Sequence, residues 1–101
     1  MVYILTLMDR PAAGDLRLRV RPEHKAYLAA AAGRIAFAGP LTADDGVEMI
    51  GSLLAMDFDS REAATAWLAD EPFTKAGLYA STSILAFANL WPQKTGFPPA
   101  A

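Results

Sequence analysis

Three segments of the chain carry large apolar residues at consecutive positions, which leaves them without a polar face. A β-strand points successive side chains to opposite sides of its sheet, so a strand with one solvated face alternates apolar and polar residues. In the segment 2–8 both sides are apolar, one formed by Val2, Ile4 and Met8 and the other by Tyr3, Leu5 and Leu7. The segments 48–58 and 80–91 share this two-sided character. A sheet built from these strands therefore needs cover on both faces.

The pattern between these strands predicts two helices. Pro22 is tolerated best in a first helical turn and Gly33 is typical after a last one, which predicts a helix over Pro22–Ala32. Ser60 is a preferred N-cap, and the approach to Pro72 ends a helix, which predicts a second one over Ser60–Ala69. The other elements are expected at Val2–Met8, Ile35–Ala38, Glu48–Phe58 and Ala80–Trp91 (strands) and at Phe73–Gly77 (one helical turn).

The element order β-α-β-β-α-β predicts an α+β fold of the ferredoxin-like kind. With right-handed crossovers it gives a four-stranded antiparallel sheet with both helices on one face. Residues 1–92 are expected to form one domain and residues 93–101 a C-terminal tail. Because two helices cover one face, a second copy of the chain is expected to cover the other, giving a homodimer. The alternative is that the tail or a long loop covers that face within one chain.

The composition narrows the class of protein. The 101 residues include no cysteine, which excludes a disulfide scaffold and a thiolate nucleophile. A net charge of −2 argues against a nucleic-acid partner, and no apolar run reaches the roughly 18–20 residues of a membrane span. No basic region precedes the first strand, so we expect no signal peptide and a cytoplasmic location. One histidine and no phosphate-binding glycine pattern predict neither a metal nor a cofactor.

The single histidine, His24, falls in the first turn of the helix expected at Pro22. Unpaired backbone N–H groups there favour a neutral imidazole, which can act as a general base near neutral pH. Asp70 and Glu71 follow the second helix, where negative charge is unfavourable, and one of them would accept the imidazole N–H and orient the ring. The alternatives are a histidine packed into the core and a solvated acidic helix end.

Two further residues are candidates for binding a substrate oxygen. Ser52 interrupts an apolar strand after Gly51, so its hydroxyl is expected either to face a cavity or to bond the backbone. Arg10 follows the first strand, and its guanidinium would clamp an acidic substrate. Solvated positions without a role are expected for Arg17, Arg19, Arg21 and Arg34.

Four motifs resemble those of the YCII-related (YciI-like) family, in the family's order: Arg21-Pro22-Glu23-His24-Lys25-Ala26-Tyr27-Leu28, Ala38-Gly39-Pro40-Leu41, Gly51-Ser52-Leu53-Leu54 and Asp70-Glu71-Pro72-Phe73-Thr74-Lys75-Ala76-Gly77-Leu78. The resemblance covers residues 1–92 and implies a dimeric α/β-barrel of ferredoxin-like subunits. It also implies a pair between His24 and the acidic residue before Pro-Phe, which is usually Asp in the family. Glu71 holds that position and Asp70 precedes it, so either carboxylate is a candidate partner.

Most members of this family have no known reaction, but one branch resembles enzymes that eliminate chloride from a hydroquinone without a cofactor. The resemblance therefore implies a cofactor-independent lyase or isomerase of a small aromatic or enolisable acid. Its catalytic residues would be His24 with Glu71 or Asp70, and Ser52 or Arg10 would bind the substrate. The alternatives are a small-molecule-binding module without turnover and a dimerisation domain with a buried histidine.

Overall fold

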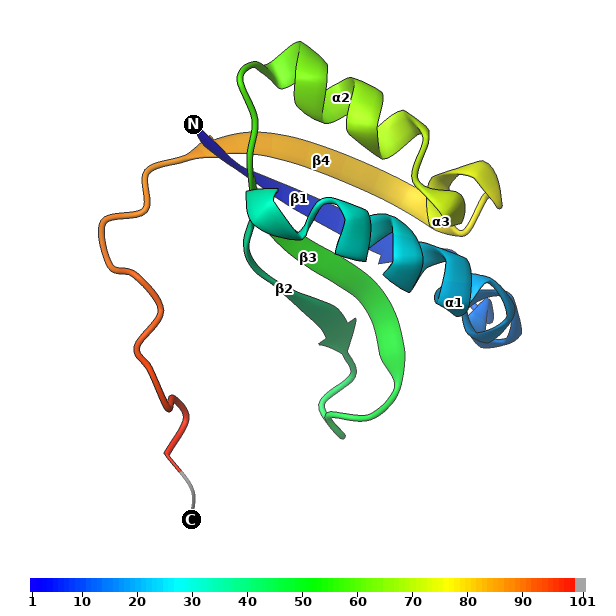
Figure 1. Ribbon diagram of the computed structural model, residues 1–101. Helices are drawn as coiled ribbons and strands as arrows, with labels where there is room; N and C mark the ends of the chain where they lie inside the picture. The colour runs from blue at the N-terminus through cyan, green and yellow to red at the C-terminus, as the bar shows by residue number, and fades with distance from the viewer. Residues whose placement is uncertain (100–101) are drawn as a thin grey trace.

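The sheet of the protein contains four strands, and each neighbouring pair is antiparallel (Figure 1). A computed structural model describes residues 1–99. The strand order is β2-β3-β1-β4. The elements are β1 (Val2–Asp9), α1 (Gly14–Ala30), the short 3-10 helix η1 (Ala32–Arg34), β2 (Ile35–Thr42), β3 (Met49–Asp57), α2 (Arg61–Ala69), α3 (Pro72–Lys75) and β4 (Tyr79–Phe87). This arrangement confirms the α+β ferredoxin-like prediction.

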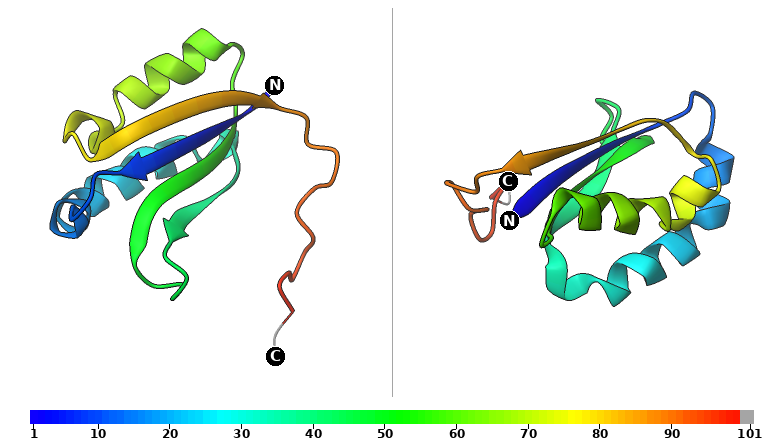
Figure 2. Two further views of the ribbon diagram at one scale, coloured as in Figure 1. Left: turned by 180° about the vertical axis from the view of Figure 1, so that it is seen from behind. Right: turned by 90° about the horizontal axis from the view of Figure 1, so that it is seen from above.

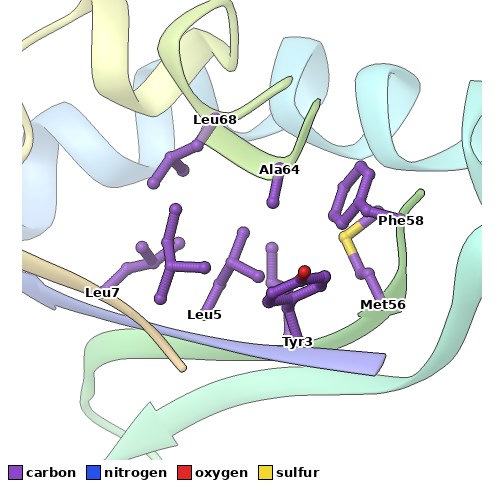
Figure 3. Packing of buried hydrophobic residues seen from close by; sticks show 9 residues of the cluster. Tyr3, Leu5, Leu7, Met56, Phe58, Ala64 and Leu68 are labelled. Carbon is purple, nitrogen blue, oxygen red and sulfur yellow. The ribbon is translucent and has the colours of Figure 1, made fainter. Parts of the chain in front are cut away.

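The core lies between the helices and the strands β3, β1 and β4 of the sheet. Leu5 of β1 pairs with Leu54 of β3 on one side and with Ile84 of β4 on the other, so three buried aliphatic side chains lie in a row. Figure 3 shows the β1 side chains facing Ala64 and Leu68 of α2. Each large aliphatic side chain buried in this layer contributes about 1.5–3 kcal/mol. The packing of these buried side chains holds in place the strands that border the candidate site.

Both long helices lie on one face of the sheet, and the view from behind in Figure 2 shows the other face open. On that open face, Leu85 is 63% exposed and Phe87 is 40% exposed. The tail runs away beyond the end of β4, and Trp91 within it is 94% exposed. Residues 88–99 thus leave the β4 end of the open face uncovered, and residues 100–101 of the expected tail lie outside the described residues.

The first helix begins at Gly14, so the prediction that it begins at Pro22 was wrong. Pro22 lies inside α1, where its ring leaves the carbonyl of Leu18 without its helical N–H partner. Both Leu18 and Pro22 are exposed, so water can satisfy that carbonyl and the helix continues past the proline. The earlier start matters because it brings Arg17 into the helix.

None of the helices within residues 1–99 is long and apolar enough to cross a membrane.

The other elements agree with the prediction except at their ends. β4 stops at Phe87 instead of Trp91, because Phe87 already pairs with Val2 at the start of β1 and no partner strand remains. β2 continues to Thr42 instead of Ala38; it is an edge strand, where a proline such as Pro40 is tolerated. The Ser60 N-cap is confirmed, since its hydroxyl accepts the backbone N–H of Ala63 at 3.1 Å.

Candidate active site

His24 of α1 and Glu71 at the start of α3 form a buried pair, although 47 positions separate them in the sequence. Nδ1 of His24 is hydrogen-bonded to Oε1 of Glu71. Both side chains are buried, and Glu71 has no exposed surface at all. A carboxylate can only accept, so Nδ1 is the donor and Nε2 is the ring nitrogen left to accept a proton.

The carboxylate of Glu71 is held by two further donors besides His24. As the N-cap of α3, it accepts the backbone N–H of Phe73 at 3.1 Å. The hydroxyl of Tyr79 donates to Oε2 at 2.9 Å. Burial, reinforced by the negative charge of Glu71, raises the pKa of Tyr79 well above its ordinary value, so the hydroxyl keeps its proton and remains a donor. Glu71 is therefore fixed in the position that orients the imidazole.

Phe73 holds the imidazole from a second direction. Its ring stacks on His24 with centroids 4.1 Å apart and planes 18° apart. The guanidinium carbon of Arg17 lies 4.9 Å from the centroid of the same phenyl ring. Aromatic stacking of this kind restrains the plane of a ring, while the hydrogen bond to Glu71 restrains its rotation. The orientation of His24 is thus set by packing as well as by charge.

Arg17 is buried at the centre of a second polar cluster, so the expectation of a solvated side chain was wrong. Its Nε and Nη2 donate to the two carboxylate oxygens of Asp9 at 2.8 and 3.3 Å. Nη2 also lies 2.9 Å from the carbonyl oxygen of Gly51 and 2.9 Å from the hydroxyl oxygen of Ser52. Since Ser52 accepts from Arg17, the hydroxyl hydrogen of Ser52 is available for another acceptor.

Gly51 permits the close approach of β3 to β1 at this point. A Cβ atom at Gly51 would lie 2.4 Å from the carbonyl oxygen of Leu7, which is closer than real side chains come. Glycine is the residue that allows two backbones to meet so tightly. The approach places the carbonyl of Gly51 and the hydroxyl of Ser52 beside Arg17.

A cavity of about 280 Å³ lies beside His24, between α1 and the strands β2 and β3. Its α1 wall consists of Arg17, Arg21, His24, Lys25 and Leu28. The opposite wall is mostly apolar and consists of Ala38, Gly39, Pro40, Met49, Ser52 and Leu54. Ligand sites commonly measure roughly 300–1,000 Å³, so this cavity suits a small ligand.

The structure brings some of the sequence-predicted residues to this cavity and leaves others away from it. His24 and Ser52 line it, and Glu71 contacts His24. Asp70 is exposed as the C-cap of α2. Arg10 follows β1 and is exposed, and its backbone N–H donates to the carbonyl oxygen of Leu78. Arg10 borders two other hollows and does not line the cavity beside His24. Within residues 1–99, no three potential metal ligands of the His, Cys, Asp or Glu type come together.

The fold and the buried histidine–glutamate pair beside a small cavity define a ferredoxin-like α+β domain with a candidate proton-transfer site. The chain belongs to the YCII-related domain family, whose family model matches residues 1–88. This result confirms the family resemblance of the sequence motifs.

Two curated relatives match along their whole length. Protein YciI of Escherichia coli O6:H1 (strain CFT073) is 34% identical over 98 residues, which cover 90% of this chain and 100% of the relative. An uncharacterized protein of Haemophilus influenzae (strain Rd) is 32% identical over 98 residues, which again cover 90% of this chain and 100% of the relative.

A solved structure with the same fold is 5-chloro-2-hydroxyhydroquinone dehydrochlorinase (TftG) from Burkholderia phenoliruptrix AC1100, in complex with 2,5-dihydroxybenzoquinone. It superposes with a TM-score of 0.81 at 32% identity, covering 87% of this chain and 94% of that one. The chain is therefore similar to an enzyme that removes chloride from an aromatic compound.

Proposed function

We propose that this chain is a cofactor-independent lyase or isomerase that acts on a small aromatic or enolisable acid, with His24 as the general base and Glu71 as the residue that orients it. The observation that carries this proposal is the engagement of Nδ1 of His24 by Glu71. It leaves Nε2 as the proton acceptor in a side chain that lines the cavity.

The proposed step is a proton transfer followed by elimination or reprotonation. Nε2 of His24 removes a proton from the bound substrate, and the buried carboxylate of Glu71 stabilises the positive charge that forms on the ring. In an elimination, the released electron pair forms a double bond and a leaving group departs with its own pair. In an isomerisation, His24 returns the proton to another carbon. Neither route needs an oxidant or reductant.

Ser52 is the proposed contact for a substrate oxygen. Its hydroxyl oxygen is held by Arg17 and its side chain lines the same cavity as His24. Its hydrogen can then donate to the oxygen on which negative charge develops, and such donors commonly stabilise enolates and similar anions. The similarity to TftG, a dehydrochlorinase, supports the lyase form of the proposal.

The second candidate is a binding module without turnover, which the cavity alone would serve equally well. We also propose that two copies of the chain associate through the open face of the sheet, because Leu85 and Phe87 lie exposed there, on the side of β4 opposite the buried Ile84. TftG carries a bound small molecule, which supports a ligand for either candidate.

The experiment uses the purified full chain with two readouts. Chloride release from 5-chloro-2-hydroxyhydroquinone tests elimination, and deuterium uptake from heavy water into a panel of enolisable aromatic acids tests proton abstraction in general. We expect turnover of at least one compound, and a loss of about 100-fold or more in kcat for His24→Asn. The control variant Asp70→Asn should retain the wild-type rate.

Two results would contradict the proposal. Turnover that survives in His24→Asn would remove the histidine from the mechanism. Binding of panel members without chloride release or deuterium uptake would favour the binding module instead, because a ligand that stabilises the fold without being converted is only bound.

A further inference from the structure

Three cationic side chains of α1 line the cavity that contains His24. Arg17, Arg21 and Lys25 stand four positions apart, so they share one side of the helix. The charge of Arg17 is matched by Asp9. Among residues 1–99, no carboxylate lies within ion-pair distance of Arg21 or Lys25.

This arrangement costs the fold stability. Like charges four positions apart on a helix repel one another, so the unpaired charges of Arg21 and Lys25 oppose each other. The chain as a whole has a net charge of −2, so a local excess of positive charge does not reflect its general composition. Positive charge gathered at a cavity attracts anions to it.

The remaining walls of the cavity suit the body of such an anion. Leu28 and Leu54 supply apolar surface, and Ala38 and Pro40 of β2 supply more. A volume of about 280 Å³ accommodates a ligand built around one ring. Arg21 is half-buried and Lys25 is exposed, which places the two unpaired cations toward solvent. Ser52 and His24 are buried at the inner end.

We propose that Arg21 and Lys25 form an anion subsite at the outer end of this cavity, and that the subsite binds the carboxylate of a small planar organic acid. The ring then lies on the apolar wall, and the reacting end lies beside His24 and Ser52. A guanidinium presents two parallel N–H groups to a carboxylate, and charged hydrogen bonds of this type are stronger than neutral ones. This inference deepens the proposed function by naming the feature that selects its substrate.

The subsite can be tested by binding alone. Benzoate and benzamide have nearly the same shape, but only benzoate carries a charge. We expect an NMR titration of the full chain to give a Kd for benzoate at least about tenfold lower than that for benzamide, the ratio that one modest charged contact provides. Benzoate should also shift the ring resonances of His24, which are unique because the chain has one histidine.

Matched variants separate the subsite from general charge. The double variant Arg21→Gln/Lys25→Gln should lose the preference for benzoate while its affinity for benzamide stays constant. The control Arg19→Gln/Arg61→Gln removes the same charge from exposed positions that do not line this cavity and should keep the preference. All four side chains are exposed or half-buried, so the variants are expected to fold.

Three results would overturn the inference: equal affinity for the two probes, a preference that survives in Arg21→Gln/Lys25→Gln, or benzoate binding that leaves the His24 resonances unmoved. The last would show that the anion binds away from His24, for example in the neighbouring hollow that Leu18, Arg21, Pro22 and Lys25 border. The variant His24→Asn distinguishes a failure of this subsite from a failure of the proposed function. It should keep the preference for benzoate but lose proton transfer.

Discussion

The hydroxyl of Tyr79 lies 2.9 Å from Oε2 of Glu71 and donates a hydrogen bond to it, so the carboxylate that orients His24 is itself held by a residue of β4. Oε1 of the same carboxylate meets His24 and the backbone N–H of Phe73. The orientation of the histidine thus depends on a chain of contacts that runs from the sheet through α3 to α1.

The contact between Tyr79 and Glu71 predicts a pH dependence of stability. Burial raises the pKa of Tyr79 above its ordinary value of 10.0, so the folded chain favours the protonated hydroxyl. A raised pKa gives stability that is complete below the unfolded value and is lost as the pH rises beyond it. The free energy of unfolding should therefore fall above about pH 10, and it should fall less steeply in Tyr79→Phe. Urea unfolding between about pH 9 and pH 11 measures both slopes, and equal slopes would contradict the prediction.

The two neighbouring carboxylates should respond very differently to substitution. Glu71→Ala leaves the buried donors of His24 and Tyr79 without their acceptor, and each buried donor left unpaired costs about 1–3 kcal/mol. Asp70→Asn alters an exposed side chain and should change the free energy of unfolding by less than about 0.5 kcal/mol. Urea denaturation at neutral pH compares the two variants. Similar losses in both would show that Glu71 is not the buried partner.

Two glycines provide a matched test of the approach between β1 and β3. Gly51→Ala forces a methyl group to within 2.4 Å of the Leu7 carbonyl oxygen, and overpacking of this kind costs about 1–3 kcal/mol. A Cβ at Gly39 meets nothing within 4 Å, so Gly39→Ala should be nearly neutral. Thermal unfolding should show a clear loss for the first variant alone. A stable Gly51→Ala protein would mean that the strands are not so tightly apposed.

Self-association through the open face can be tested with two exposed leucines. Leu85 is 63% exposed on the open face, and Leu18 is 66% exposed on α1. A charge buried in an apolar interface is costly, so Leu85→Glu should shift the protein toward monomers. Leu18→Glu, which changes charge and exposed apolar area by similar amounts, should leave the oligomeric state unchanged. Light scattering at micromolar concentration distinguishes these results, and a wild-type monomer would refute the proposed dimer.

Local patterns in the sequence predicted the elements and several site residues. The two-sided apolar strands, the Ser60 N-cap and the order of elements depend on nearby residues, and they predicted the fold correctly. His24 is a candidate because it is the single histidine of the chain, and Ser52 because it interrupts an apolar strand; both line the cavity.

The residues that sequence reasoning missed depend on contacts between distant elements. A helix that begins at Pro22 excludes Arg17, whereas the observed helix from Gly14 places Arg17 and His24 seven positions apart on one face. Tyr79 gave no local signal, since its partner is set by the return of the chain after α3. The residue that pairs with His24 is the one that caps α3, which is Glu71. The signal for this in the sequence is that Glu71 directly precedes Pro72, because an acidic residue before a proline is typical of a helix start.

The most direct measurement is the protonation of the two ring nitrogens of His24 by proton–nitrogen NMR. A base oriented by Glu71 requires that the neutral ring of His24 carry its proton on Nδ1 and leave Nε2 without one. We therefore expect the Nδ1–H tautomer in the wild-type chain, and a loss of that preference in Glu71→Gln. A neutral ring protonated on Nε2 in the wild-type chain would contradict the proposed role of the pair.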